Sequence, residues 1–191
     1  ANGNDIKGQG FSNNAKIGEI INSSFVRNSA STTFDGVDAQ GGAIWTDQDL
    51  KITSTDGYES LFDGNYVSQN GEVRPEAIYV DNSELTLETK TGGKFLFNDE
   101  INGKDYKLNV VGDNTGVITF NNNIRNAEIS LGNNTVNVTE GSYLGNNNSL
   151  TLNSGTLNIN NLGSAPVHFN DFSLVGGQMN IDVVDVLPWV P

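Results

Sequence analysis

Apolar and polar residues alternate along this chain in short bursts, most regularly in its last third. Within one stretch the alternation occurs twice, first at Leu150 and Leu152 and then at Leu157 and Ile159. Three segments built in this way align almost residue for residue and follow one another at steps of 21 and 22 residues: 129–139, 150–160 and 172–182. A period of two is typical of short strands with one buried face. The pattern predicts two or three short strands in each repeat.

A repeat of this length buries its apolar face only when neighbouring copies stack on one another. The first apolar residue of successive copies recurs at steps of 35, 23, 21, 21 and 22 residues: Leu50, Leu85, Leu108, Ile129, Leu150 and Phe172. We therefore predict an all-β fold, a single-stranded right-handed parallel β-helix with roughly 21–23 residues per coil in its C-terminal half. The hand follows from the general rule for parallel crossovers.

The uneven steps predict the organisation of the chain. We expect one β-helix domain over 1–191, with longer coils in 1–84, regular coils in 85–186, and an exit or linker at 187–191, where two prolines end the pattern. Projecting loops are expected in the longer coils, at 35–40, 54–60 and 68–75. Insertions in solenoids gather on one face and often carry binding.

The amino-acid composition supports a β-helix and narrows the classes of partner that we expect. The chain has 29 Asn and 22 Gly, which suit tight corners, and Asn at equivalent positions can form ladders of side-chain amides. A net charge of −13, with no Lys or Arg after Arg125, argues against nucleic acid and against anionic membranes as partners. There is no cysteine, no apolar run long enough to span a bilayer, and no signal peptide at Ala1, so we expect a mature product or an excised piece.

Two tetrapeptide motifs overlie the alternation. One is Phe-x-x-Asn, in which Phe is expected to fill the interior and Asn to turn a corner; apart from Phe11, its copies pair Phe25 with Asn28, Phe62 with Asn65, Phe95 with Asn98, and Phe120 with Asn123. The other is Gly-Gly-Ala-Ile, in which the glycines bend the backbone before the chain re-enters the core: Gly41, Gly42, Ala43 and Ile44. Glu76-Ala77-Ile78 is a degenerate copy.

These motifs resemble those of autotransporter passenger domains with repeats of the polymorphic outer-membrane protein type. The resemblance covers residues from about 11 to 182, and the β-barrel translocator of that family is not in the sequence. It implies a passenger segment found outside the cell or on the outer-membrane surface of a Gram-negative bacterium. In such proteins the β-helix serves as a stalk, an adhesin or a self-associating rod.

Candidate chemistry is sparse, and we predict no catalytic residue, no cofactor and no metal site. The single histidine, His168, lacks a recognisable catalytic signature and is expected at an exposed corner. Acidic pairs occur at Asp47/Asp49, Asp99/Glu100 and Asp182/Asp185, and we interpret them as solvated decoration of the rod. Calcium in the loops at 35–38 or 47–49 remains an open alternative.

Aromatic side chains in the longer coils offer a second binding route, because sugars stack on such rings. The candidate ligand surface consists of Trp45, Tyr58, Tyr66 and Tyr79. The alternative is that Trp45 and Tyr79, which follow Ala-Ile in the repeat, only cover one face of a coil.

The functional hypothesis is a non-enzymatic bacterial cell-surface or secreted segment that acts as adhesin, stalk or self-associating element. Its expected partners are further copies of itself, head-to-tail or lateral, or a glycan or protein of a host or bacterial surface. We expect no nucleic acid partner and no membrane insertion by this segment. The alternative hypothesis is a polysaccharide-binding or polysaccharide-degrading β-helix protein.

Overall fold

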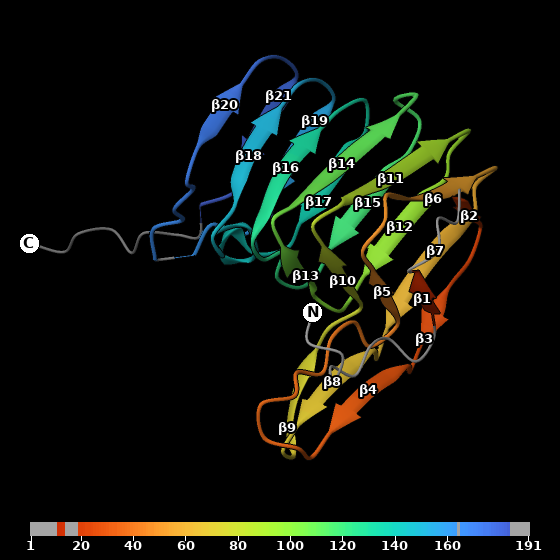
Figure 1. The fold of residues 1–191 in the computed structure, drawn as a ribbon. Helices are drawn as coiled ribbons and strands as arrows, with labels where there is room; N and C mark the ends of the chain where they lie inside the picture. The colour runs from red at the N-terminus through yellow and green to blue at the C-terminus, as the bar shows by residue number, and fades with distance from the viewer. Residues whose placement is uncertain (1–10, 14–18, 164, 184–191) are drawn as a thin grey trace, which may run out of the picture.

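The computed structural model describes residues 11–13, 19–163 and 165–183, and the regular secondary structure in these residues is almost entirely β-strand (Figure 1). The first sheet holds, in spatial order, β1 (Phe11–Asn13), β5 (Ile44–Thr46), β10 (Ile78–Asp81) and β13 (Ile101–Lys104). The second sheet holds β2 (Glu19–Ile21), β6 (Leu50–Thr55), β11 (Glu84–Lys90), β14 (Tyr106–Gly112), β16 (Ala127–Leu131), β18 (Ser149–Leu152) and β20 (Phe172–Leu174). The third holds β3 (Phe25–Val26), β7 (Glu59–Asp63), β12 (Lys94–Phe97), β15 (Val117–Phe120), β17 (Thr135–Val138), β19 (Thr156–Ile159) and β21 (Gln178–Ile181). A fourth, the projecting sheet, holds β4 (Ser29–Thr32), β8 (Tyr66–Gln69) and β9 (Glu72–Pro75).

The fold is all-β with long parallel sheets, as predicted. Strands in the first three sheets pair in parallel, and within the described residues the antiparallel pairing is that of β8 with β9. Helix is limited there to one 3-10 turn, η1 (Gly141–Leu144). No helix in the part of the chain that the structure describes is long and apolar enough to cross a membrane.

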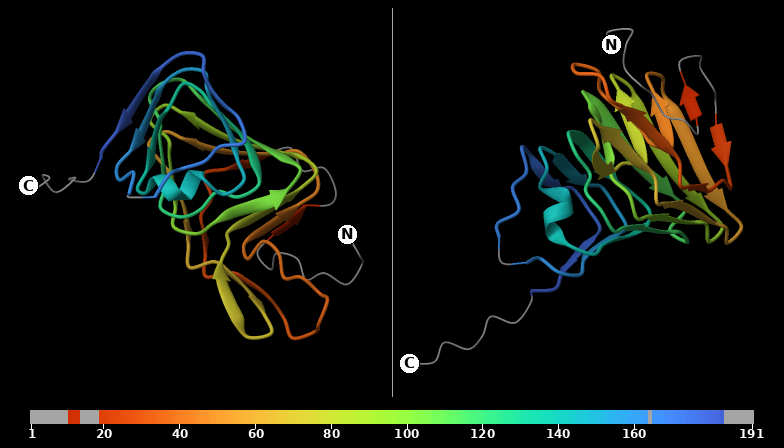
Figure 2. Two further views of the ribbon diagram at one scale, coloured as in Figure 1. Left: turned by 90° about the vertical axis from the view of Figure 1, so that its left-hand side faces the viewer. Right: turned by 90° about the horizontal axis from the view of Figure 1, so that it is seen from below.

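The chain visits the sheets in turn, and each strand pairs with the strand of the same sheet that it reaches one circuit later (Figure 2). The predicted spacing of the leading apolar residues is confirmed, because these residues are successive register partners: Leu50, Leu85, Leu108, Ile129, Leu150 and Phe172. After β13 the first sheet ends, and the bridge between Ile101 and Ile124 continues that side of the molecule.

A single core runs through the circuits, because alternate residues of each strand point inward. Strands β11 and β14 show this alternation clearly in their burial. Four phenylalanines from successive circuits form a column in which ring centroids lie 5.3, 4.5 and 5.4 Å apart: Phe25, Phe62, Phe97 and Phe120. The column confirms that Phe of the motif fills the interior.

The predicted alignment of one Phe-x-x-Asn copy, that at Phe95, with the copies in neighbouring circuits is wrong. Phe95 pairs with Ser60 and with Ile118, whereas Phe97 pairs with Phe62 and Phe120, so the copy Phe95-x-x-Asn98 is displaced by two residues. Both phenylalanines are buried, because residues two apart on a strand share a face. The aligned copy begins at Phe97 and therefore places Glu100 where the other circuits have Asn.

Asparagines occupy the corners and form the expected ladders of side-chain amides. In one ladder the side chain of each residue donates through Nδ2 to Oδ1 of the residue one circuit earlier, at 3.0, 2.9 and 2.8 Å: Asn102, Asn126, Asn147 and Asn170. Asn126 and Asn147 also adopt left-handed backbone, with φ of 59° and 60°. Asn tolerates this conformation better than most residues, so it serves both the corner and the ladder.

The predicted projecting loops are placed differently by the structure. Residues 35–40 and 68–75 belong to the part of the chain that leaves the stack with the projecting sheet (Figure 1). The prediction for 54–60 is wrong, because these residues form the tight corner between β6 and β7, with Asp56 and Gly57 in left-handed backbone. The predicted exit at 187–191 lies outside the described residues.

Candidate functional site

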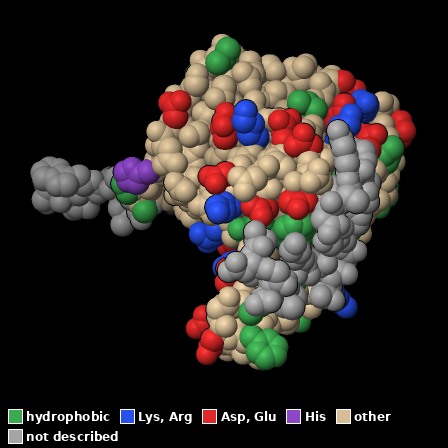
Figure 3. Space-filling view, in the orientation of Figure 1, with side chains coloured by type: hydrophobic (Ala, Val, Ile, Leu, Met, Phe, Trp, Pro, Cys, Tyr) green, Lys and Arg blue, Asp and Glu red, His purple; other side chains and the backbone are tan. Residues whose placement is uncertain are grey.

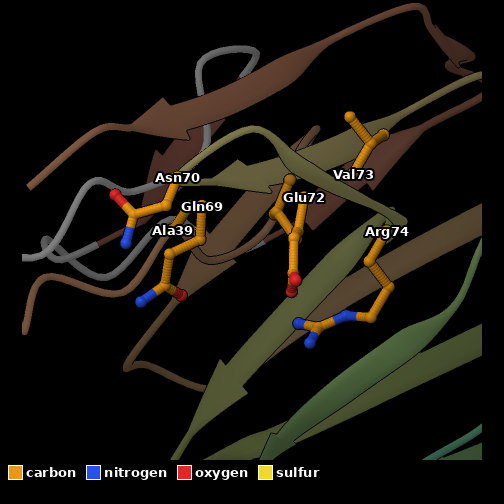
Figure 4. A pocket seen from close by; sticks show the side chains of 7 residues that line it. Ala39, Gln69, Asn70, Glu72, Val73 and Arg74 are labelled. Atoms are coloured by element: carbon orange, nitrogen blue, oxygen red, sulfur yellow. The ribbon is translucent and has the colours of Figure 1, made fainter. Parts of the chain in front are cut away.

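A hollow of about 550 Å³ lies on one face of the projecting sheet (Figure 4). It is lined by side chains of the β8–β9 hairpin and of the segment between β4 and β5: Ala39, Val67, Gln69, Asn70, Glu72, Val73 and Arg74. The hairpin turns at Asn70-Gly71, where both residues have positive φ, 50° and 84°. Asn-Gly is the residue pair favoured by two-residue hairpin turns of type I′.

Register places four of the lining side chains on the same face of the hairpin. Val67 pairs with Arg74 and Gln69 pairs with Glu72, and directly opposite residues of an antiparallel pair project to one side. In Figure 4 the side chains of Gln69, Glu72 and Arg74 extend toward the same space. Polar groups of three kinds therefore converge there: an amide, a carboxylate and a guanidinium.

The floor of the hollow is a small separate core. Ala30, Ala39 and Val67 are buried against one another and do not belong to the main core. Thr32, also buried, accepts a hydrogen bond from the backbone N–H of Phe34 to its Oγ1 at 3.1 Å, which fixes the start of the loop that brings Ala39 over the sheet. The hollow thus has an apolar base and a polar rim.

Gly41 and Gly42 let the chain return from this loop into β5. Gly41 has φ of 63°, and a Cβ at Gly42 would lie 2.6 Å from the carbonyl oxygens of both Glu76 and Tyr66. A side chain at either position is therefore excluded, by backbone conformation at the first and by close approach at the second. This explains the Gly-Gly of the motif, while Ala43 and Ile44 are buried in the main core as predicted.

Buried charges anchor the projecting sheet to the stack. The fully buried Glu76 carboxylate accepts from the N–H of Gly41 at 2.6 Å, from Arg74 Nη2 at 2.7 Å and from Asn102 Nδ2 at 3.2 Å. Burial raises the pKa of the Glu76 carboxyl, and the donors from Gly41 and Arg74 act against that rise. The degenerate Gly-Gly-Ala-Ile copy thus uses its acidic residue to hold two neighbouring circuits and the hairpin together.

The chain of charges continues into the next circuits. Arg74 Nε lies 3.7 Å from Glu100 Oε2, and Arg125 donates to the two oxygens of Glu100 at 3.0 and 3.1 Å. Two glutamates and two arginines therefore alternate and balance one another. The Arg74 guanidinium is oriented by both glutamates while about half of its side chain, 49%, stays exposed at the hollow.

Asp99, the neighbour of Glu100, has a similar structural setting. Its carboxylate accepts from the backbone N–H of Gly64 and Asn65 at 3.1 and 2.9 Å, and from Asn65 Nδ2 at 2.8 Å. Burial raises the pKa of the Asp99 carboxyl, and the bonds from Asn65 counter this shift. The pair Asp99/Glu100 is therefore buried and bonded, which corrects its interpretation as solvated decoration.

The predicted aromatic ligand surface is not assembled. Trp45 is 1% exposed, and its Nε1 donates to Gln40 Oε1 at 3.1 Å, so it cannot be a stacking platform. Tyr79 is its register partner on the next circuit, Tyr58 lies at the corner between β6 and β7, and Tyr66 lies on the face of the projecting sheet opposite the hollow. The four side chains therefore do not share one surface.

The remaining candidates from the sequence are separate from the hollow. His168 is exposed between β19 and β20, and Asp49 accepts from the backbone N–H of Glu84 at 3.0 Å. Among the described residues no group of three or more His, Cys, Asp or Glu side chains is arranged to hold a metal ion. Acidic and basic side chains are interspersed over the face seen in Figure 3, with no large patch of one sign.

A second hollow, of about 510 Å³, lies at the end of the stack formed by the last described circuit. It is apolar, and its lining includes Leu150, Phe169, Phe172, Met179 and Ile181. Phe172 and Ile181 are 43% and 44% exposed, although their register partners Leu150 and Ile159 are buried. Strands β20 and β21 are the outermost described strands of their sheets.

No protein-family model matches the chain, and no curated protein or solved structure is significantly similar to it. The residues that line the hollow were not named as site residues from the sequence, although all but Val67 lie in the projecting loops predicted at 35–40 and 68–75. The signal that marks it is Asn70-Gly71 between two short runs of alternating residues, which identifies a hairpin where a loop was expected.

Proposed function

We propose that the stacked circuits form a single-stranded, right-handed parallel β-helix. Strands recur in constant order, pair in parallel with those one circuit later, and share one core. Repeats of this length depend on stacking for burial, and parallel crossovers are nearly always right-handed. A crystal structure of the full chain tests this, and left-handed crossovers between the second and third sheets would contradict it.

We also propose that the chain is a non-enzymatic, adhesive segment of a bacterial cell-surface or secreted protein, similar to an autotransporter passenger. The stack acts as a rigid stalk, and the projecting sheet makes the adhesive contact. One observation carries this proposal: the projecting sheet, which leaves the repeat, has its own core, a polar hollow and a buried anchor at Glu76. Insertions on solenoids are where binding usually resides.

The sequence supports the proposed location. The absence of cysteine fits many secreted bacterial surface proteins, and a net charge of −13 keeps a long rod soluble. The Phe-x-x-Asn and Gly-Gly-Ala-Ile motifs resemble those of Gram-negative passenger domains. The expected partner is therefore a glycan or a protein of a host or bacterial surface.

The test is a chain without the projecting sheet. Ile101 follows Phe97 by four residues and Ile124 follows Phe120 by four, so the stack itself needs no insertion at this corner. Deleting 29–43 and 66–77 joins Asn28 to Ile44 and Asn65 to Ile78 and restores this spacing in both earlier circuits.

We expect the labelled full chain to bind epithelial cells or Gram-negative bacteria in flow cytometry, and the shortened chain to lose binding while it keeps its far-ultraviolet circular dichroism. Equal binding by a folded shortened chain would contradict the proposal. If the shortened chain does not fold, Gly71→Pro, which breaks only the hairpin turn at positive φ, replaces it in the same assay.

A second candidate function, self-association, is favoured by the apolar end of the stack. Phe172 and Ile181 expose interior side chains there, on β20 and β21, which are the outermost strands of their sheets among the described residues. Sedimentation velocity over a concentration series is expected to show larger species, which Phe172→Ser reduces. Monomers at the highest concentration for the unmodified chain would contradict self-association.

A further inference from the structure

We propose that the hollow on the projecting sheet binds a neutral sugar unit through neighbouring hydroxyl groups. This inference deepens the adhesive role proposed above and rests on it. The hollow, at about 550 Å³, has the size of a small-molecule site, and it is open enough to admit one unit of a longer glycan.

The polar groups at the hollow match the hydrogen-bonding needs of a diol. Glu72 offers a carboxylate that only accepts, Arg74 offers a guanidinium that only donates, and the Gln69 amide does both. The three lie on one face, because Gln69 pairs with Glu72 and Arg74 follows Glu72 by two residues on the same strand. Each hydroxyl of a sugar both donates and accepts, so two neighbouring hydroxyls can form hydrogen bonds with all three of these side chains.

The guanidinium is pre-oriented for such a contact. The fully buried Glu76 holds Arg74 at 2.7 Å, and Glu100 lies 3.7 Å from its Nε. A group fixed in this way loses little conformational entropy when a ligand binds. Half of the Arg74 side chain nevertheless stays exposed and within reach of a ligand.

The charge balance favours a neutral ligand over an acidic one. Arg74 is already neutralised by Glu76 and Glu100. Glu72 forms no ion pair with the described residues, and Asp35 lies close by, where its Oδ1 accepts from Asn70 Nδ2 at 3.0 Å. Together with the net charge of −13, these carboxylates repel a uronate or a sialic acid.

The base of the hollow suits the apolar face of a sugar ring. Val67 and Ala39 form this base, and Val73 lies at the edge of the hollow. A peptide added as a further strand is disfavoured, because the outer strand β9 carries Glu72, Arg74 and Pro75, and charges and proline protect sheet edges from such pairing. The observations therefore favour a sugar over an extended peptide.

The experiment measures binding of the full chain to immobilised neutral oligosaccharides of glucose, galactose, mannose and N-acetylglucosamine, beside oligogalacturonate as an acidic probe. We expect binding to at least one neutral probe. Glu72→Gln should weaken it by roughly tenfold or more, the loss typical of a hydrogen bond to a charged group, and Gln69→Ala by roughly two- to tenfold, as for a hydrogen bond between neutral groups. The matched control is Glu59→Gln, an exposed carboxylate on β7 outside the projecting sheet, which should bind as the unmodified chain does.

Three results would overturn the inference: neutral sugars that bind equally to the Glu72 and Gln69 variants, preference for oligogalacturonate, or no binding to any probe. The cell-binding comparison with the shortened chain remains independent of all three. If cells still bind the full chain and not the shortened one, the adhesive role stands and the partner is not a neutral sugar in this hollow. If shortening changes nothing, the proposed function fails as well.

Discussion

The regular circuits and the projecting sheet are stabilised in different ways. In the circuits each interior strand lies between two parallel neighbours, and the core and the amide ladders repeat from one circuit to the next. The projecting sheet has three strands, a core of Ala30, Ala39 and Val67, and one buried carboxylate at its base. Stability is therefore distributed over many equivalent contacts in the stack and concentrated in a few specific ones in the projecting sheet.

This difference has a functional consequence. A stack whose contacts repeat tolerates insertions at a corner, because the strands on either side keep their register. Phe25 and Phe62 remain in the aromatic column although long insertions separate each of them from Ile44 and Ile78. The projecting sheet can therefore vary in sequence while the stalk stays unchanged.

The largest expected effect is the loss of a ring from the aromatic column. Phe97 is fully buried between Phe62 and Phe120, so Phe97→Ala should lower the free energy of unfolding by about 3–5 kcal/mol. Denaturant unfolding followed by circular dichroism measures this. Phe172→Ala, at a ring that is 43% exposed, is the control and should cost much less. Equal losses would contradict a core that continues through the interior circuits.

A smaller, local effect is expected at the anchor of the projecting sheet. Glu76→Gln removes the nearer of the two charged partners of Arg74 and weakens the bond to the Gly41 N–H, and should cost about 2 kcal/mol. Limited proteolysis should cut the β8–β9 hairpin faster, with the stack intact. Glu72→Gln, on the same hairpin but exposed, is the matched control. Unchanged cleavage in the Glu76 variant would show that the anchor does not hold the sheet.

A substitution at a corner of the regular circuits should lower the free energy of unfolding by still less. Asn147→Ala removes the two hydrogen bonds that Asn147 makes in an exposed amide ladder and places Ala at φ of 60°, for a total cost of about 1–2 kcal/mol. Asn147→Gly removes the same two bonds without the backbone strain. The difference between the two variants in denaturant unfolding measures the strain at Ala less the additional chain entropy that Gly loses on folding. A larger loss for the Gly variant than for the Ala variant would contradict strain at this corner.

The dependence of stability on pH should have opposite signs at Asp113 in the regular circuits and at Glu76 at the base of the projecting sheet. Hydrogen bonds from Thr115 and from the N–H of Thr91 lower the pKa of Asp113 to about 2, below its ordinary value of 3.8. Its contribution to stability is therefore complete above about pH 4 and is lost as the pH falls toward 2. Asp113→Asn should destabilise the chain at neutral pH and have a much smaller effect near pH 2. An equal effect at both pH values would contradict this.

Glu76 should behave in the opposite way, because burial raises its pKa when the chain is folded. Its protonated form favours the folded state, so this contribution is complete below the ordinary carboxyl pKa of 4.5 and is lost as the pH rises through the raised value. Melting temperatures of the unmodified chain and of Glu76→Gln across this range measure the effect. The difference between them should change most just above pH 4.5, and a constant difference would contradict the shift.

The sequence was sufficient to predict the repeat, but it did not predict the contacts that the insertions make. The leading residues from Leu50 to Phe172 are register partners, because period-two burial in every copy allows one register in which these apolar residues stack on one another. The same periodicity could not distinguish Phe95 from Phe97, which share a face. Burial of Trp45 and the role of Glu76 depend on segments distant in sequence, and no local pattern encodes them.

The measurement that tests the central claim most directly is native-state hydrogen exchange with peptide-level resolution. Interior strands β11, β14 and β16 should exchange last and together, at the free energy of global unfolding. The β8–β9 hairpin should exchange earlier, through an opening that Glu76→Gln makes easier and Phe97→Ala does not affect selectively. Exchange of the hairpin and the interior strands at one common rate, in the unmodified chain and in both variants, would contradict a stalk with a separately anchored binding sheet.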